Sequence, residues 1–170
     1  MPRRKDVSTL TNAKLNKFRA LLDGYISKPK VNPVKEHKAA GKMSSGLMIH
    51  EQGFLTWHQH FLAELETWLV NNGGKEFVPL PYWNPADPIP VQLNKNNTNV
   101  NMPLPSNLQP AALKTVGDYM TLNDRMLPYH ANVHNNLGGA MPDPKKSPSD
   151  PIFWPFHAYL VGVYEQWLDT

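Results

Sequence analysis

The sequence contains no cysteine, and this absence excludes several classes of site at once. Without thiols the chain can form no disulfide, no thiolate-bound metal site such as a zinc ribbon or a blue-copper centre, and no cysteine nucleophile. The absence is also compatible with a reducing compartment, so we favour the cytoplasm as the expected location. Any redox or metal chemistry must therefore rest on other side chains.

Long apolar runs and a strong charge of one sign are missing as well. No apolar stretch reaches the roughly 18 residues of a membrane span, and the N-terminus lacks a hydrophobic signal core. The net charge is only +3 over 170 residues, and the basic residues are scattered apart from PRRK at 2–5. We expect this terminus to be solvated, and we predict neither a membrane nor a nucleic-acid partner.

The length predicts one domain over residues 1–170, with enough chain to bury a core. Apolar residues at helical spacing predict a helix over 11–26 with Thr11 as its N-cap, and a second over 54–70 that NNGG ends. Residues 79–117 are dense in proline and asparagine and show no helical period, so they form either a functional wrap or a mobile lid.

Two further helices are predicted in the C-terminal part. One opens at Pro128, a favourable first helical residue, and ends before the glycine pair at 138–139. The other has Asp150 as its cap and continues toward residue 169, with a kink expected at Pro155. The predicted fold is therefore all-α, a four-helix bundle with long irregular connections rich in proline and asparagine.

Histidine is the residue type that stands out among the polar side chains. The chain has 7, at positions 37, 50, 58, 60, 130, 134 and 157. His130 and His134 are four residues apart, so both rings project from one face of a helix and could bind one metal. Two surface histidines with this spacing are the alternative, but the apolar neighbours predict a partly buried helix, where unpartnered imidazoles would be costly.

The segment HQH at 58–60 contains only one candidate ligand. At about 100° per residue, His58 and His60 point in opposite directions from a helix. His58 lies one turn from Phe54 and from Leu62, so it faces the core, whereas His60 is predicted to face solvent. We therefore retain His58 and exclude His60.

A second segment, FWPFH at 153–157, repeats the form of FLTWH at 54–58. In each, a phenylalanine precedes the histidine by one helical turn, so two helices could present braced imidazoles to each other. His157 taken alone has another explanation, a buried neutral histidine with one hydrogen bond. With His37 and His50 the set comprises six imidazoles and no carboxylate partner.

This ligand set indicates the class of metal. Di-iron bundles need several glutamates with Glu-x-x-His pairs, which are missing, and HEQGF at 50–54 is no zinc-protease motif. Neutral imidazoles suit zinc, copper, iron and nickel. Two dications bound only by neutral ligands would place four uncompensated positive charges in the site. Two Cu(I) ions would halve this total charge, so we favour a dicopper site over a dizinc site.

Several motifs resemble those of the type-3 copper proteins, the family of tyrosinases, catechol oxidases and haemocyanins. FLTWHQHFLAELE resembles the first copper motif, and LPYWNP at 80–85 is similar to the family's L-P-Y-W-D-W. YHANVHNNLGGAM, followed by SPSDPIFWPFHAYLVGVYEQW, resembles the second copper motif. The resemblance implies a first copper half over about 37–70 and a second over about 128–168.

The resemblance also implies ligands, cofactors and an activity. It implies two copper ions, with His37, His50 and His58 on the first and His130, His134 and His157 on the second. It further implies O2 as co-substrate, a small phenolic substrate and oxidation of o-diphenols to o-quinones. Reversible O2 binding of the haemocyanin type, and a non-catalytic metal-binding bundle, are the alternatives.

Two departures from the family pattern bear on hydroxylation of monophenols. Family tyrosinases carry asparagine after the first histidine of the second copper, where this chain has Ala131, and a glutamate about two turns earlier, which is missing here. Asn132 and Asp124 are the candidate replacements for positioning water or substrate. We therefore expect diphenol oxidation, and hydroxylation of monophenols stays open as an additional activity. The site is expected to be open, or covered by residues 86–117 or by another subunit, and a copper-delivery helper is a further candidate partner.

Overall fold

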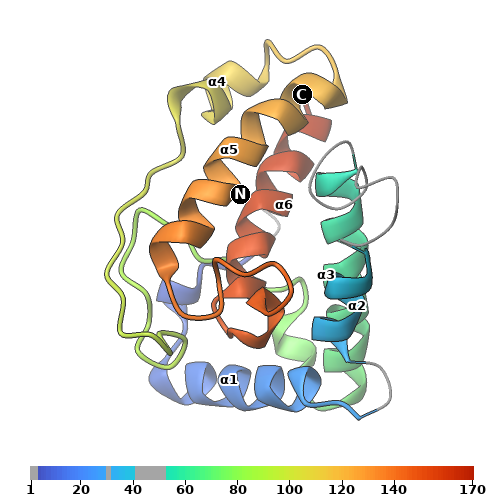
Figure 1. Ribbon diagram of the computed structural model, residues 1–170, viewed down its shortest axis with the longest axis vertical. Helices are drawn as coiled ribbons and strands as arrows, with labels where there is room; N and C mark the ends of the chain where they lie inside the picture. The colour runs from blue at the N-terminus through green and yellow to red at the C-terminus, as the bar shows by residue number, and fades with distance from the viewer. Residues whose placement is uncertain (1–3, 30–31, 41–52) are drawn as a thin grey trace.

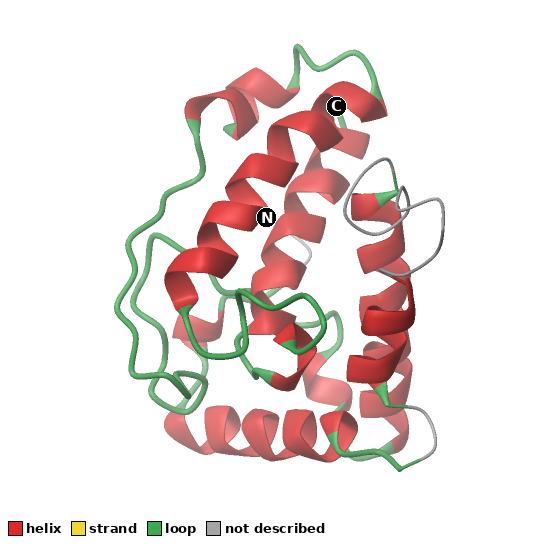
Figure 2. Cartoon of the chain, viewed as in Figure 1, coloured by secondary structure: helices red, strands yellow, loops and turns green. Residues whose placement is uncertain are grey.

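The computed structural model describes residues 4–29, 32–40 and 53–170. The described residues form helices joined by loops and contain no strand (Figure 2), which confirms the all-α class. Short 3-10 helices at Val7–Thr9, Lys75–Phe77, Ser106–Leu108 and Ser147–Ser149 join the longer elements. The α-helices are α1 (Asn12–Ile26), α2 (Pro33–Ala40), α3 (Phe54–Asn71), α4 (Pro110–Leu113), α5 (Tyr119–Leu137) and α6 (Phe153–Leu168).

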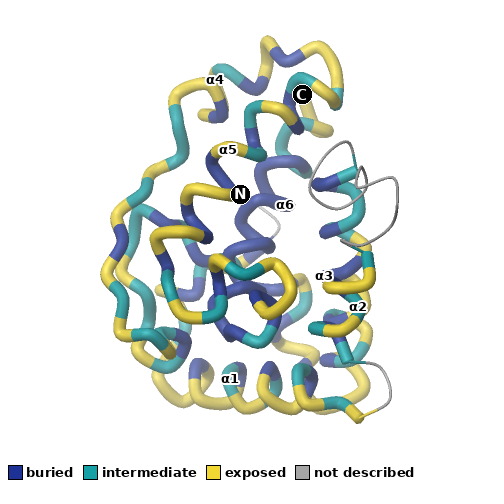
Figure 3. The backbone as a smooth tube through the Cα atoms, in the orientation of Figure 1, coloured by how far each residue is buried: buried dark blue, intermediate teal, exposed yellow. Residues whose placement is uncertain are grey.

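Three long helices form the centre of the molecule, with α6 in contact with both α3 and α5. Helix α1 crosses one end of this group, and α2 lies beside α3 (Figure 1). Figure 3 shows that α6 is buried along most of its length, whereas α1 exposes its outer face. The number of helices in the bundle and its single-domain extent stay predictions.

Helices α1 and α3 follow the sequence prediction closely. The Thr11 side chain caps α1 by accepting a hydrogen bond from the Lys14 N–H at 3.3 Å. The predicted apolar stripe of α1 is buried as expected, at Leu15, Phe18, Leu22 and Tyr25. Gly24 has a packing role, because a Cβ at this position would lie 3.3 Å from the ring of Trp68 in α3. The glycine therefore lets α1 approach α3 closely.

The prediction that α5 begins at Pro128 is wrong. The helix begins at Tyr119, because Asp118 caps it by accepting a hydrogen bond from the Thr121 N–H at 2.9 Å. Pro128 lies inside the helix, on its exposed side, where it removes only the bond to the carbonyl of Asp124. The C-terminal end is as predicted, with Gly138 at φ +68° directly after Leu137.

Helix α6 begins at Phe153, three residues after the predicted cap. Asp150 binds the Ile152 N–H at 3.2 Å, so its carboxylate orders the turn before the helix. Pro155 is the third residue of α6, where a backbone N–H has no acceptor within the helix. The expected kink at Pro155 therefore has no basis, because the proline removes no helical hydrogen bond.

The basic N-terminus is not solvated at Arg4, contrary to the sequence expectation. The Arg4 guanidinium is buried and forms ion pairs with Glu66 of α3 at 2.7 Å and Glu165 of α6 at 2.9 Å. It also donates to the carbonyl of Leu80 at 3.3 Å. One side chain thus links the N-terminal segment to both helices and to the start of the long connection.

Residues 86–117 pass along the side of α5 that faces away from α3 (Figure 1). The preceding LPYWNP segment is anchored on α6, since the Trp83 N–H donates to the carbonyl of Pro155 at 3.0 Å. Across the described ranges, no helix combines the length and the hydrophobicity needed to cross a lipid bilayer.

Candidate metal centre

Four helices bring the described candidate ligands into the core. His37 lies on α2, His58 on α3, His130 and His134 on α5, and His157 on α6, and all five are buried. Among the residues outside this set, His60 is exposed, as the helical spacing predicted. His50 lies outside the described residues, so its predicted role stays a prediction.

The five imidazoles form one continuous cluster. The rings of His58 and His157 are stacked, with centroids 4.6 Å apart and an interplanar angle of 17°. His157 lies 5.2 Å from His130 and 5.2 Å from His134, and those two rings are 4.3 Å apart. His37 joins the cluster through His58 at 5.7 Å. Rings from the two predicted halves of the site therefore meet in the core.

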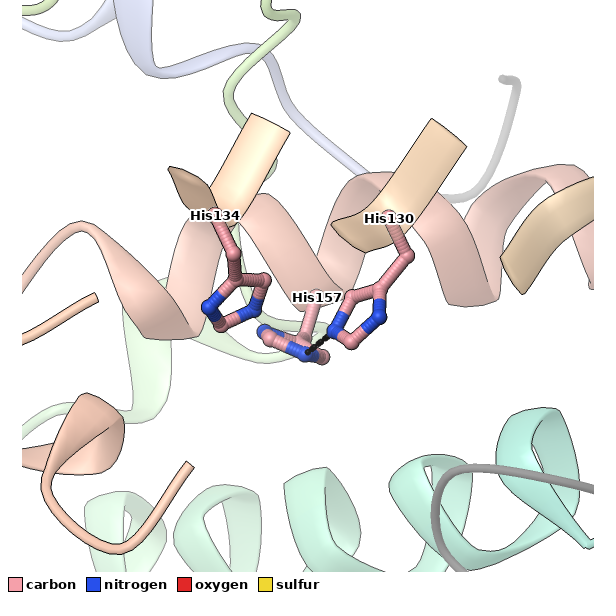
Figure 4. A group of neighbouring side chains, drawn as sticks. All are labelled: His130, His134 and His157. Atoms are coloured by element: carbon pink, nitrogen blue, oxygen red, sulfur yellow. Dashed lines mark hydrogen bonds between the residues drawn. The ribbon is translucent and has the colours of Figure 1, made fainter. Parts of the chain in front are cut away.

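His130, His134 and His157 could hold one metal ion together. One ring nitrogen from each lies within 4.8 Å of the others. Figure 4 shows the rings of His130 and His134 projecting from one helix toward His157, whose Nε2 is 3.2 Å from Nε2 of His130. Three converging imidazole nitrogens match the ligand preference of copper and zinc.

The two Phe-x-x-x-His segments orient their rings in the same way. Nδ1 of His58 lies 2.8 Å from the carbonyl of Phe54, and Nδ1 of His157 lies 2.8 Å from that of Phe153. A carbonyl can only accept, so each Nδ1 carries the proton and each Nε2 is left with a lone pair. The form shared by FLTWH and FWPFH therefore corresponds to a shared ring orientation.

The loop after the glycine pair orients two more rings. The carbonyl of Met141 accepts from Nδ1 of His134 at 2.6 Å, and the carbonyl of Pro144 accepts from Nδ1 of His37 at 2.7 Å. This loop thus fixes one candidate ligand from each half of the site. Main-chain acceptors cannot be recognised from side-chain types, so the glycine pair is the one feature of this loop that is visible in the sequence.

Aromatic side chains pack against the imidazoles. Phe153 stacks on His157 with centroids 3.9 Å apart, and Phe54 contacts both His58 at 4.7 Å and His130 at 4.5 Å. Trp57 packs edge-on against His58 at 5.0 Å. These contacts restrict ring rotation.

The surroundings keep His157 neutral. Burial lowers the pKa of His157 well below the usual 6.5, and the neighbouring imidazoles His58, His130 and His134 lower it further. A neutral imidazole is the form that binds metal. His157 can therefore bind a transition-metal ion without a competing proton.

A pocket of about 440 Å³ opens beside the second group of histidines. Helix α5 and the loop after it form its described walls, and Lys145 and Lys146 are not among the lining residues. Residues 86–117 contribute no described lining residue, so they do not provide the cover considered from sequence. The lining comprises Leu127, His130, Ala131, His134, Asn135, Met141, Pro142, Pro144 and Ser147.

Asn132 and Asp124 do not line this pocket. Both line a separate pocket of about 780 Å³ that α5 shares with the segment around Met102 and Pro103. Their predicted role in positioning water or substrate at His130 therefore has no structural support. Ser147 is a pocket residue that sequence reasoning missed. It lies between Lys146 and Pro148, and a single serine in such a segment does not indicate a binding role.

Comparison with known families gives a match over most of the chain. A family model described as the common central domain of tyrosinase matches residues 25–111 and 90–170. Comparisons with curated proteins and with solved structures gave no match. The matched ranges include all six histidines that were predicted as ligands.

Proposed function

The chain belongs to the tyrosinase family of type-3 copper proteins, whose members are copper-dependent oxidases, and we propose that it oxidises o-diphenols to o-quinones with O2. The observation that carries this proposal is the pocket beside His130 and His134, which gives a small molecule access to the imidazole cluster. A carrier of O2 needs no such access, so the pocket supports turnover over reversible O2 binding.

We propose that His130, His134 and His157 hold one copper ion and that His37, His50 and His58 hold a second. Copper in such a site supplies electron transfer between a phenolic substrate and O2. The chain's own contribution is to aim the ring nitrogens. The carbonyls of Phe54, Phe153, Met141 and Pro144 each hold an Nδ1–H, which directs the opposite nitrogen inward.

The pocket fits a single aromatic ring. Its volume of about 440 Å³ lies in the usual range for small-molecule sites. Leu127, Met141 and the two prolines give it apolar walls, and its described lining carries no charged side chain. We therefore propose uncharged phenols with one ring as the substrate class.

Diphenol oxidation fits this pocket better than monophenol hydroxylation. No carboxylate is present among its described lining residues, so none of them can act as a strong general base for an incoming monophenol. An o-diphenol already carries both oxygens. It loses two electrons and two protons to become an o-quinone, and two such oxidations reduce one O2 to two H2O.

The test is copper loading followed by exposure to catechol in air. We expect O2 consumption and quinone absorbance in a ratio of about one O2 to two quinones, with phenol reacting at least tenfold more slowly. His134→Asn should abolish the reaction, and His60→Asn should leave it unchanged, because only His134 belongs to the cluster.

Two outcomes would contradict the proposal. Reversible O2 uptake without quinone formation would identify an O2 carrier. Full quinone formation by the His134→Asn variant would place the chemistry outside the imidazole cluster.

A further inference from the structure

Ser147 is a buried polar residue on the wall of the candidate substrate pocket. It begins the 3-10 helix Ser147–Ser149, and its relative exposure is 0%. Its hydroxyl oxygen has no hydrogen-bond partner among the described residues. It lines the same pocket as His130 and His134.

A buried hydroxyl without a partner is unfavourable for the protein alone. Leaving such a group unsatisfied forfeits the hydrogen bonds that it makes to water in the unfolded chain, and buried polar side chains are therefore nearly always paired. A buried hydroxyl that lies beside a binding pocket and has no partner within the protein can form a hydrogen bond with a bound ligand.

The rest of the pocket offers few competing groups. The carbonyls of Met141 and Pro144 are already engaged by His134 and His37. Asn135 is exposed, and the remaining non-histidine lining is apolar apart from Ser147. The Ser147 hydroxyl is thus the buried polar side chain in the described lining, other than the histidines, that can bind a phenol oxygen.

We infer that Ser147 binds a ring hydroxyl of the o-diphenol and thereby positions the ring against the histidine wall. This inference rests on the proposed function and deepens it by naming a residue that recognises the substrate. A hydroxyl both donates and accepts, so it suits an uncharged phenol oxygen. A monophenol has one oxygen to share between the metal side and Ser147, whereas a diphenol has two.

The first test compares Ser147→Ala with Ser149→Ala in the copper-loaded full chain. Ser149 lies on the same 3-10 helix, does not line the pocket and serves as the matched control. We expect Ser147→Ala to raise KM for catechol about five- to tenfold, the effect of one lost hydrogen bond. The value of kcat should change less than twofold, and Ser149→Ala should behave as the unmodified chain.

The second test does not depend on turnover. Catechol and benzene are titrated into the metal-free full chain and followed by ligand-observed NMR. Ser147→Ala should weaken catechol binding about five- to tenfold and leave benzene binding unchanged, because only catechol carries oxygens. Its melting temperature should be unchanged or higher, since the substitution removes an unsatisfied hydroxyl.

The possible results distinguish a failure of the Ser147 inference from a failure of the proposed function. Equal catechol binding by the Ser147→Ala variant and the unmodified chain would overturn the role of Ser147, even with full oxidase activity. Loss of benzene binding together with a lower melting temperature would overturn it too, because that result indicates a packing role. Failure of the unmodified copper-loaded chain to oxidise catechol would instead overturn the proposed function. The NMR titration of the metal-free chain would then still test the role of Ser147.

Discussion

A hydrogen bond at Nδ1 determines which ring nitrogen of a candidate histidine is left to bind a metal. In four of the five described histidines Nδ1 lies 2.6–2.8 Å from a main-chain carbonyl, which leaves Nε2 as the donor atom for a metal. For His58 and His157 the acceptor is the residue four positions earlier, so the Phe-x-x-x-His spacing was informative. For His37 and His134 the acceptors come from a distant loop, and no local pattern predicts them.

His157 should make the stability of the metal-free protein depend on pH. Its pKa is lowered in the folded state by burial and by neighbouring imidazoles, from the usual 6.5. Below pH 6.5 the unfolded chain binds a proton at this imidazole and the folded chain does not. The free energy of unfolding therefore falls as pH falls. The loss from one such group is about 1 kcal/mol between about pH 7.5 and about pH 5.5.

Urea denaturation of the metal-free chain at the two pH values measures this loss. His157→Gln should reduce it by about 1 kcal/mol, because the variant has no imidazole to protonate at this position. An identical loss in the His157→Gln variant would show that the buried ring does not resist protonation.

The loop between α5 and α6 owes its path to two glycines. Gly138 and Gly139 have φ values of +68° and +58°, in the left-handed region that other residues rarely adopt. A Cβ on Gly139 would lie 2.1 Å from the side-chain oxygen of Asn96, whereas one on Gly138 would meet nothing within 4 Å. Asn96 in turn donates to the buried carboxylate of Asp150 at 2.8 Å.

Alanine substitutions at three glycines should therefore rank by cost. Gly138→Ala adds backbone strain of about 1–2 kcal/mol, and Gly139→Ala adds the clash with Asn96 to a similar strain. Gly117→Ala is the control, because a Cβ there meets no atom within 4 Å. Chemical denaturation measures the order, and a Gly139→Ala variant as stable as Gly117→Ala would contradict the assigned loop geometry.

Helix boundaries show what local sequence can and cannot predict. Thr11 was identified as a cap because its polar side chain directly precedes a clear apolar stripe. The start of α5 was missed because Pro128 resembles a first helical residue, although a proline on an exposed helix face is tolerated nine residues after the first. Asp118, whose side chain caps the true start, directly follows the irregular stretch 79–117.

Arg4 joins parts of the chain that are far apart in sequence. Its side chain is 6% exposed and pairs with Glu66 and Glu165, which are themselves mostly buried. Removing one partner of a buried ion pair leaves uncompensated charge and costs about 3 kcal/mol or more. The PRRK segment could not reveal this contact, because both partners lie on other elements.

Arg4→Ala should accordingly lower the free energy of unfolding by about 3 kcal/mol. The matched control is Lys17→Ala, which removes an exposed pair with Glu76 and should cost far less, because solvent screens an exposed pair. Equal effects of the two substitutions in thermal or urea denaturation would show that Arg4 does not hold α3 and α6 together.

Most of the candidate site was predictable, and its limits have physical causes. The core positions of His58, His130, His134 and His157 follow from helical spacing and from the repeated aromatic motif. The pocket was not predictable, because its walls combine one helix face with a loop that has no periodic pattern. Asn132 was a plausible neighbour of His130 in sequence, but about 200° of helix rotation separates the two side chains.

Copper content after reconstitution measures the dinuclear site itself. We expect two copper ions per chain by elemental mass spectrometry after removal of excess metal. His157→Asn should retain fewer, and His60→Asn should retain two. One zinc or no metal in the unmodified chain, or an undiminished copper content in the His157→Asn variant, would contradict the dinuclear imidazole site.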